Sequence, residues 1–312
     1  MSEVQSAPRR VGAIDLGTNT AMLLVAERGP AGELVPVHEE ELYPRLGEGL
    51  EALGTLAPEA RTRTLDAVRR LAERAEEYGA HTLSLVGTSA LREGDPTGAF
   101  LAELRRVVPA ARAIDGEEEA RLATAGALAA TGVAGPFVCI DVGGGSTEVV
   151  VGDTYGTAGA FTMTTATSLR LGSVRLHGRH RDSEEPYLDA YGDARTLAFH
   201  ELSALRAEGR SVVAVAGTAA TVGALVLQAH GQPWSEGTWL HTRAVDDVVE
   251  LLVSLDEDER TALHPWLAAR ADVAPYGAIV LQALLHHLDA EEVCVSSAGV
   301  RWGLALELLG TP

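Results

Sequence analysis

One short pattern occurs twice in this chain of 312 residues. Residues 11–20 read Val-Gly-Ala-Ile-Asp-Leu-Gly-Thr-Asn-Thr, and residues 138–146 read Val-Cys-Ile-Asp-Val-Gly-Gly-Gly-Ser. In each copy an apolar run leads into Asp, an apolar residue, Gly, two small residues and a hydroxyl side chain. The two aspartates, Asp15 and Asp141, are separated by about one domain length. An internal repeat on this scale predicts two related halves that face each other across a cleft.

The chemistry of the repeated pattern indicates what such a cleft would bind. A strand that ends in Asp-x-Gly and then turns sharply brings a carboxylate, free backbone N–H groups and a hydroxyl to one point, which suits phosphate and a divalent cation. A single copy would be explained equally well as a tight hairpin with Asp as a turn cap. Because there are two copies, we interpret both as phosphate-binding turns. The expected phosphate-binding residues are Asp15, Gly17, Thr18, Asn19, Thr20, Gly143, Gly144, Gly145, Ser146 and Thr147, and the expected metal ligands are Asp141 and Glu148.

Further segments are candidates for phosphate binding. Gly217 and Thr218 lie where a predicted strand runs into a helix, and backbone N–H groups at a helix start bind anions readily. Many turns of this kind carry Gly-Thr for structural reasons alone. Arg92 directly follows a strand and is a phosphate candidate, with a surface ion pair as the alternative. Arg170 and Arg175 are similar candidates.

The composition limits the partners. The chain has 44 acidic and 25 basic residues, a net charge of −19, and no lysine, so every basic side chain is Arg. A P-loop, which needs a Lys, is therefore excluded. The acidic balance argues against a nucleic-acid or membrane partner, because those affinities depend on cationic patches. A polyphosphate ligand would have to be held by Arg, backbone amides and a cation.

The same composition indicates a globular protein. No apolar stretch approaches the ~20 residues that a membrane span needs, and residues 1–10 lack the apolar core of a signal peptide. We therefore expect a cytoplasmic location. Cys139 and Cys294 each lie in a short apolar run, so we expect two buried thiols rather than a disulfide.

Hydrophobic periodicity predicts alternating strands and helices, and hence an α/β fold of mixed sheets with helices on both faces. A break at residues 131–136 predicts two domains, 1–131 and 132–312. In the first half we expect strands at 11–14, 22–26, 34–37, 82–86 and 111–114, and helices at 58–78, from Asp95-Pro96 onward, and at 116–130. In the second half we expect helices at 187–208, 219–229, 245–255 and 274–288, and strands at 212–216 and 292–296.

An acidic run opens the helix expected at 116–130. Asp115 and Glu118 have the spacing of a capping box, in which Asp115 caps the helix and Glu118 is occupied at its third position. Successive helical residues point in directions about 100° apart, so Glu119 is left as the carboxylate free to act in a cleft. The alternative is a solvated acidic helix end that complements the helix dipole.

These segments, in this order, resemble the exopolyphosphatase and guanosine pentaphosphate phosphatase family of the actin-like ATPase superfamily. The resemblance extends over nearly the whole chain, and the combination is far more specific than any one motif. The matching segments are Ile14–Thr20, Gly87–Arg92, Gly116–Leu122, Ile140–Glu148, Leu171–Leu176, Gly217–Thr221 and Gly299–Gly303.

The resemblance implies two actin-like (ribonuclease H-like) domains around a cleft and hydrolysis of the terminal phosphoanhydride of polyphosphate or of guanosine pentaphosphate. It implies Mg²⁺ as the cofactor, with Mn²⁺ as the alternative, and places the family's catalytic glutamate at Glu119. Asp115 stands where the family usually has Ser, and both are good helix caps. We expect no additional C-terminal helical domain of the kind that longer members have. Exposed apolar helical faces in the second half would permit a homodimer.

We expect Glu119 to act as general base, Asp141 and Glu148 to hold the metal, and the turns with Arg92 to bind phosphate. The first alternative is a guanosine pentaphosphate 5′-phosphohydrolase, for which the sequence locates no guanine site among its 4% of aromatic residues. A sugar or acetate kinase of the same superfamily is a second. A third is a regulator that binds polyphosphate or nucleotide without turnover.

Overall fold

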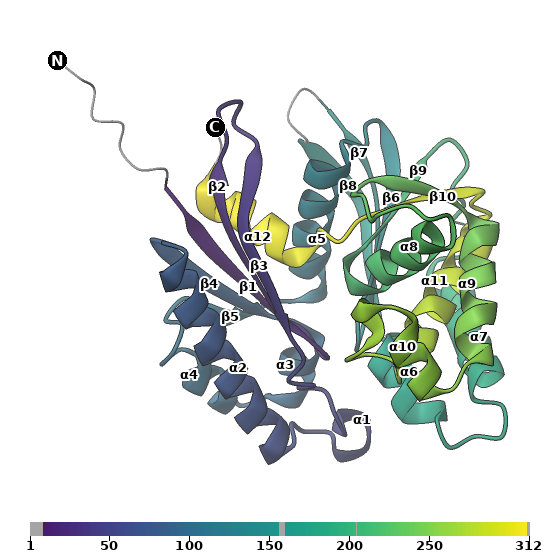
Figure 1. The fold of residues 1–312 in the computed structure, drawn as a ribbon, viewed down its shortest axis with the longest axis horizontal. Helices are drawn as coiled ribbons and strands as arrows, with labels where there is room; N and C mark the ends of the chain where they lie inside the picture. The colour runs from purple at the N-terminus through teal and green to yellow at the C-terminus, as the bar shows by residue number, and fades with distance from the viewer. Residues whose placement is uncertain (1–8, 156–159, 204, 311–312) are drawn as a thin grey trace.

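The computed structural model of the protein describes residues 9–155, 160–203 and 205–310. Its backbone forms two lobes, each built on one mixed β-sheet (Figure 1). The strands of the first sheet are β1 (Val11–Leu16), β2 (Ala21–Arg28), β3 (Leu34–Leu42), β4 (Thr82–Gly87) and β5 (Ala111–Ala113). They lie in the order β3-β2-β1-β4-β5, in which β1 is antiparallel to β2 and parallel to β4.

The second sheet repeats this arrangement. Its strands are β6 (Pro136–Val142), β7 (Thr147–Thr154), β8 (Phe161–Leu169), β9 (Ser211–Val215), β10 (Thr238–His241) and β11 (Glu292–Val295). The order is β10-β11-β9-β6-β7-β8, so that β6, like β1, is antiparallel to the next strand and parallel to a later one. The two copies of the sequence pattern therefore lie in two sheets in which the corresponding strands pair in the same way. The expected fold class, two actin-like (ribonuclease H-like) halves with mixed sheets, is confirmed.

Helices cover the sheets in layers. In the first half they are α1 (Leu50–Leu53), α2 (Pro58–Glu77), α3 (Ser89–Gly94), α4 (Ala99–Leu104) and α5 (Gly116–Thr131). In the second half they are α6 (Ser173–His180), α7 (Pro186–Glu201), α8 (Ala216–Ala229), α9 (Thr242–Ser254), α10 (Glu257–Leu263), η1 (Pro265–Leu267), α11 (Ala274–Leu288) and α12 (Val300–Leu309). Helices α2 and α4 pack on the outer face of the first sheet, and α7, α8, α9 and α11 join the outer core of the second.

A third core lies between the two sheets and is filled mainly by α5 and α12. Helix α12, late in the chain, packs on β1 and β2, whereas α5, from the first half, packs on β6, β7 and β8 (Figure 1). Each helix thus contacts the sheet formed by the other half of the sequence. The boundary at residues 131 and 132 stays a prediction, because these two helices join the halves into a shared core.

Several element boundaries differ from the sequence-based expectation. The helix expected from Asp95-Pro96 begins instead at Ala99, after Gly98 in the left-handed region. The Asp95 carboxylate accepts the N–H of Leu101 from outside the helix, 2.8 Å away, so a turn comes before the helix starts. The helix expected at 187–208 ends at Glu201.

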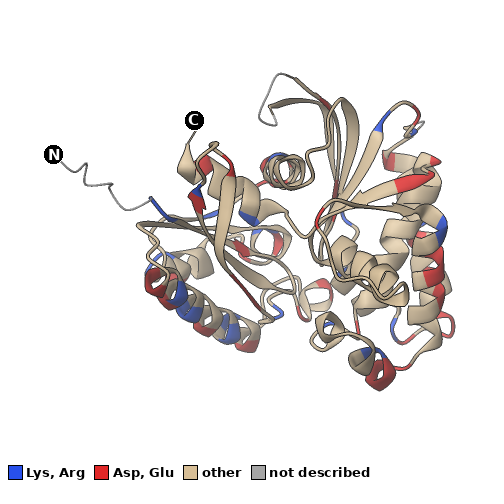
Figure 2. Ribbon diagram, turned by 45° about the horizontal axis from the view of Figure 1, so that its top comes forward, with Lys and Arg blue, Asp and Glu red and all other residues tan. Residues whose placement is uncertain are grey.

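Charged residues of both signs lie along α2. Acidic and basic residues alternate along this helix (Figure 2), where Asp66 pairs with Arg69 and Glu77 with Arg74 one turn apart. Such exposed pairs stabilise a helix only slightly. Among the described residues, no helix is both long enough and apolar enough to cross a membrane.

The contact between α5 and α12 depends on two glycines. A Cβ atom added to Gly303 would collide with the Leu122 carbonyl oxygen, and one added to Gly126 would collide with the Gly299 carbonyl oxygen. The backbones of the two helices therefore touch directly, which no larger residue permits without separating them.

We expect Gly303→Ala to lower the free energy of unfolding by about 1–3 kcal/mol, because overpacking a filled core forces backbone shifts. Urea unfolding followed by circular dichroism measures the change. Gly192→Ala is the matched control, since Gly192 lies within α7 with no atom near its Cβ position, and it should stabilise the protein by up to about 1 kcal/mol. Equal effects of the two substitutions would contradict the close approach.

Candidate active site

Strand alternation directs both repeated aspartates toward the shared core. In β1 the side chains of Val11 and Ala13 face the central core, and Asp15 continues the same face. In β6, Phe137 and Cys139 do so, and Asp141 follows. The two carboxylates therefore point from the inner faces of opposite sheets into one cleft.

Both repeats close the same kind of turn. The N–H of Gly17 donates to the Thr20 carbonyl at 2.8 Å, and the N–H of Gly143 donates to the Ser146 carbonyl at 3.0 Å. The turns also meet, because a Cβ on Gly144 would lie 3.0 Å from the Cβ of Thr18. Larger residues at this position would push the two lobes apart.

The cleft between the turns contains most of the residues expected at the site. It is lined by Asp15, Gly17, Thr18, Asn19, Thr20, Glu119, Asp141, Gly143, Gly144, Gly145, Ser146, Gly217 and Thr218. Three other expected residues do not line the cleft. The Thr147 hydroxyl donates to the Leu171 carbonyl at 2.7 Å, Glu148 accepts from the Ser168 hydroxyl at 2.7 Å, and Arg92 contacts Glu119. Their roles in phosphate or metal binding stay predictions.

Glu119 is directed into the cleft by the start of α5. Asp115 caps the helix by accepting the N–H of Glu118 at 2.8 Å, as expected. The Glu118 side chain pairs with Arg112 instead of returning to the cap, so only half of the predicted capping box forms. Glu118 is nevertheless occupied structurally, and Glu119 is the buried carboxylate of this turn that faces the cleft.

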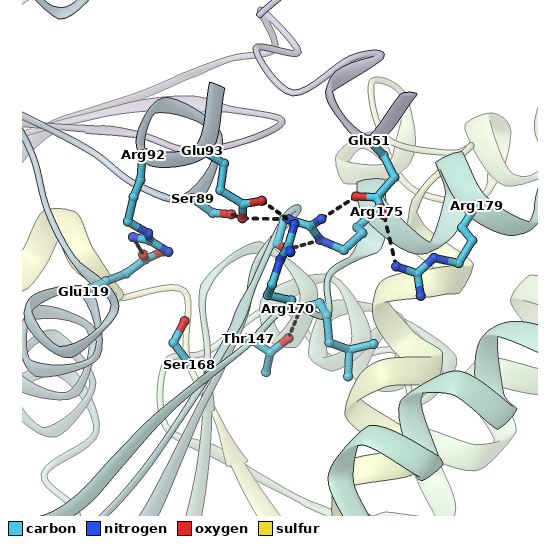
Figure 3. Close-up of polar contacts among 12 residues, drawn as sticks. Glu51, Ser89, Arg92, Glu93, Glu119, Thr147, Ser168, Arg170, Arg175 and Arg179 are labelled. Atoms are coloured by element: carbon cyan, nitrogen blue, oxygen red, sulfur yellow. Dashed lines mark hydrogen bonds and ion pairs between the residues drawn. The ribbon is translucent and has the colours of Figure 1, made fainter. Parts of the chain in front are cut away.

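Arg92, which does not line the cleft, contacts Glu119 (Figure 3). Its Nη1 donates to Glu119 Oε2 at 3.0 Å and to the Ile114 carbonyl at 2.9 Å. Arg92 therefore fixes the orientation of the glutamate, which sequence reasoning did not anticipate. Burial raises the pKa of Glu119, and Arg92 partly opposes this shift.

Four buried carboxylates share this region, and burial is the main reason why their pKa values are raised. The pKa of Asp15 rises from 3.8 to about 7, with Glu119 adding to the shift. The pKa values of Asp141 and Glu148 are raised well above the ordinary range, and both carboxylates are also repelled by Glu119. A cation bound beside these carboxylates would compensate their buried negative charge.

The donor set fits a divalent cation in part. Asp15 Oδ1 and Glu148 Oε2 are buried and have no hydrogen-bond partner, and carboxylate oxygens are the ligands that Mg²⁺ prefers. Among the described residues, however, no three or more His, Cys, Asp or Glu side chains are grouped to hold a metal by themselves. Phosphate or water oxygens would have to complete the coordination, as is usual for Mg²⁺.

The third turn lies at the start of α8. Ala216 has a positive φ of 65°, and no side chain caps the helix, so its first N–H groups remain available to an anion. The Thr218 hydroxyl donates to the Val142 carbonyl at 3.1 Å and ties this turn to β6. Gly217 lies directly against the Arg270 guanidinium, and a Cβ there would collide with it.

Two arginines at the site were not among the expected site residues. Arg270 lines the cleft and is held by Glu41 at 2.6 Å and by the Tyr43 hydroxyl at 2.7 Å, while its buried Nε has no partner. Arg301, in α12, pairs with Glu39 at 2.6 Å. Its charge partly opposes the rise that burial causes in the pKa of Asp15 and Asp141. Arg301 lies within a matching motif of the sequence, but no local pattern marks Arg270.

The geometry defines a class: a two-lobed actin-like protein whose cleft brings together two Asp-x-Gly turns and a buried glutamate. Comparison with known proteins agrees. The profile of the Ppx/GppA phosphatase family matches residues 24–311, and exopolyphosphatase 2 of Mycobacterium tuberculosis is 36% identical over 325 residues, covering 96% of this chain and 99% of that protein. The chain therefore belongs to the Ppx/GppA phosphatase family, and is a phosphoanhydride hydrolase. The resemblance identified in the sequence is confirmed.

Other relatives extend the comparison. A guanosine-5′-triphosphate,3′-diphosphate pyrophosphatase of Aeromonas hydrophila is 30% identical over 304 residues, covering 96% of this chain and 59% of that protein. The crystal structure of an exopolyphosphatase from Cytophaga hutchinsonii superposes with a TM-score of 0.84 at 21% identity, covering 96% of this chain and 98% of that chain. The family member from Aquifex aeolicus superposes with a TM-score of 0.77 at 23% identity, covering 97% and 98%. These two structures support the fold.

The raised pKa of Asp15 makes stability depend on pH. The folded protein holds this proton more tightly than the unfolded chain, so the free energy of unfolding falls as the pH rises from 3.8 to about 7. With a chelator present and phosphate absent, we expect Asp15→Asn to be more stable than the parent at pH 8 by roughly 1–4 kcal/mol, and the difference to vanish near pH 4.

Urea unfolding at several pH values measures this effect. Asp182→Asn is the control, because the Asp182 side chain is 90% exposed and its removal should not change the pH profile. A parallel course of the Asp15→Asn and parent profiles would contradict the pKa shift.

Proposed function

We propose that this protein is an exopolyphosphatase that hydrolyses the terminal phosphoanhydride of inorganic polyphosphate and releases orthophosphate. The observation that carries the proposal is the meeting of Glu119 with the two Asp-x-Gly turns in one cleft. The 36% identity with a mycobacterial exopolyphosphatase along nearly the whole of both chains supports the choice of substrate.

In the proposed reaction Glu119 is the general base. Its carboxylate accepts a proton from the water that attacks the terminal phosphorus, the bond from that phosphorus to the bridging oxygen breaks, and the shortened chain leaves. The raised pKa of a buried glutamate improves its strength as a base. The hydrogen bond from Arg92 to Oε2 orients this carboxylate.

The turns bind the phosphates. Backbone N–H groups of residues 18–20 and 144–146 supply donors, those at the start of α8 supply more, and Arg270 offers its unpaired Nε. Phosphoryl transfer depends on such positioning and charge neutralisation rather than on covalent chemistry. Asp141 and Glu148 would hold Mg²⁺, with Mn²⁺ as the alternative. When bound, the metal would neutralise the charge that develops on the phosphate oxygens.

We expect Glu119→Gln to lower kcat by about 10²–10⁴-fold, the usual contribution of general-base catalysis, while KM changes little. Orthophosphate release from polyphosphate with and without Mg²⁺ measures both constants. Glu117→Gln, an exposed carboxylate of the same helical turn, is the control and should keep the parent rate. A Glu119→Gln enzyme with near-normal turnover would exclude this assignment.

A second candidate substrate is guanosine pentaphosphate, because the structure contains a pocket that sequence reasoning did not find. It adjoins the cleft at Gly217 and Arg270 and is lined by Trp234 and Trp266, whose ring centroids are 5.4 Å apart. Indole rings bind nucleobases by stacking. A nucleoside there would leave its 5′-phosphates directed to the catalytic turns.

Trp266→Ala distinguishes the two substrates. If guanosine pentaphosphate is hydrolysed, we expect this variant to weaken its binding by about 1–3 kcal/mol, the usual contribution of one stacked base, and to leave polyphosphate hydrolysis unaffected. Steady-state rates on polyphosphate, guanosine pentaphosphate and ATP side by side measure the effect. An equal loss of polyphosphate hydrolysis would show that Trp266 supports the cleft for both substrates and does not specifically bind a nucleobase.

A further inference from the structure

A chain of ion pairs connects the two lobes beside the phosphate turns (Figure 3). We call it the interlobe ion network, formed by Glu51 and Glu93 of the first lobe and Arg170, Arg175 and Arg179 of the second. Arg170 and Arg175 both contact Glu93 at 2.8 Å, and Arg175 and Arg179 both contact Glu51. The sequence suggested Arg170 and Arg175 as phosphate ligands, whereas here they bind carboxylates.

Arg175 is the centre of this network. Its side chain is 5% exposed, and its guanidinium has acceptors in three directions. Nε donates to the carbonyl of Gly145 in the second phosphate turn at 2.8 Å, Nη2 to Glu93 at 2.8 Å, and Nη1 to Glu51. One buried cation thus contacts the phosphate turn and both carboxylates of the opposite lobe.

The same carboxylates continue the contact into the cleft. Glu93 accepts from the Ser89 hydroxyl at 3.1 Å, and Ser89 lies so close to Gly145 that a Cβ there would be 2.7 Å from its oxygen. Any separation of the lobes removes Glu51 and Glu93 from Arg175. A buried guanidinium without its counterions is strongly disfavoured, so Arg175 and the turn bound to it would have to rearrange.

We propose that Arg175 is a positioning residue that couples closure of the lobes to the shape of the Gly143–Ser146 turn. The turn has its substrate-binding geometry only while Glu51 and Glu93 hold the guanidinium. The kinetic part of this inference rests on the proposed polyphosphatase function, and the conformational part does not.

A second interlobe ion pair provides a matched comparison. Arg45 binds Asp272 through two nitrogens, at 2.5 and 3.0 Å, and also donates to the Ala269 carbonyl. It bridges the same two lobes, but its side chain has no bond to a phosphate turn. A role limited to holding the lobes together would give Arg45 and Arg175 the same phenotype.

The experiment compares Arg175→Met, Arg175→Lys, the double variant Glu51→Gln/Glu93→Gln, and Arg45→Met. Steady-state hydrolysis of polyphosphate with Mg²⁺ gives kcat and KM.

Because small misplacements at an active site cost up to about 10²-fold, we expect Arg175→Met and the double variant each to lower kcat by about 10- to 100-fold. Their combination should cost no more than either alone. Arg175→Lys should not restore kcat, since one ammonium group cannot reach all three acceptors, and Arg45→Met should raise KM with little change in kcat.

Small-angle X-ray scattering of the free protein provides a readout independent of activity. We expect a larger radius of gyration for the double variant than for the parent at 50 mM NaCl, and an increase in the parent at 500 mM NaCl, where exposed members of the network are screened. The double variant keeps the Arg175 side chain itself, so it tests the coupling even if Arg175→Met fails to fold.

The outcomes separate the two proposals. A parent protein that hydrolyses no polyphosphate would refute the proposed function, and the scattering comparison would still decide whether the network holds the lobes closed. An unchanged radius of gyration in the double variant would overturn the conformational part. In an active enzyme, equal kcat values for the parent and the double variant would overturn the coupling to the turn.

Discussion

The burial of four carboxylates in one region is the constraint on which the architecture of this site depends. Asp15 and Asp141 end the central strands of two sheets, and Glu119 and Glu148 lie near them. An interior cannot keep four such groups ionised without compensation. The surrounding structure supplies part of it, through Arg92 on Glu119 and Arg301 near both aspartates, and a bound cation would supply the rest. The fold thus concentrates acidic groups at the cleft between the two turns.

The positively charged side chains around the cleft are arginines, because the chain contains no lysine. Its planar guanidinium binds several acceptors at once. Arg175 joins a carbonyl to two carboxylates, and Arg270 joins Glu41 to Tyr43 while one nitrogen remains unpaired. These side chains therefore determine the relative positions of the segments that they join.

The sequence predicted what depends on local chemistry. The repeated Asp-x-Gly turns, the third turn at Gly217 and the cap that leaves Glu119 free all follow from residue types at short spacing, and the structure brings them into one cleft. It did not predict the interlobe ion network or the pocket at Trp266, because these join residues far apart in the chain that no periodicity relates. The phosphate-binding role expected of Arg92 stays a prediction, and its contact with Glu119 was not foreseen because it depends on how α3 and α5 pack.

The exchange of α5 and α12 between the two sheets has a consequence for biosynthesis. The inner face of the first sheet is covered by α12, which the ribosome adds only after the entire second lobe has been made. Until then the apolar residues of β1 and β2 on that face lack their native cover. The first lobe therefore cannot complete its folding until α12 has been made, even though all of its own strands emerge early. Protection of this surface by a chaperone would be needed longest for the part of the protein made first.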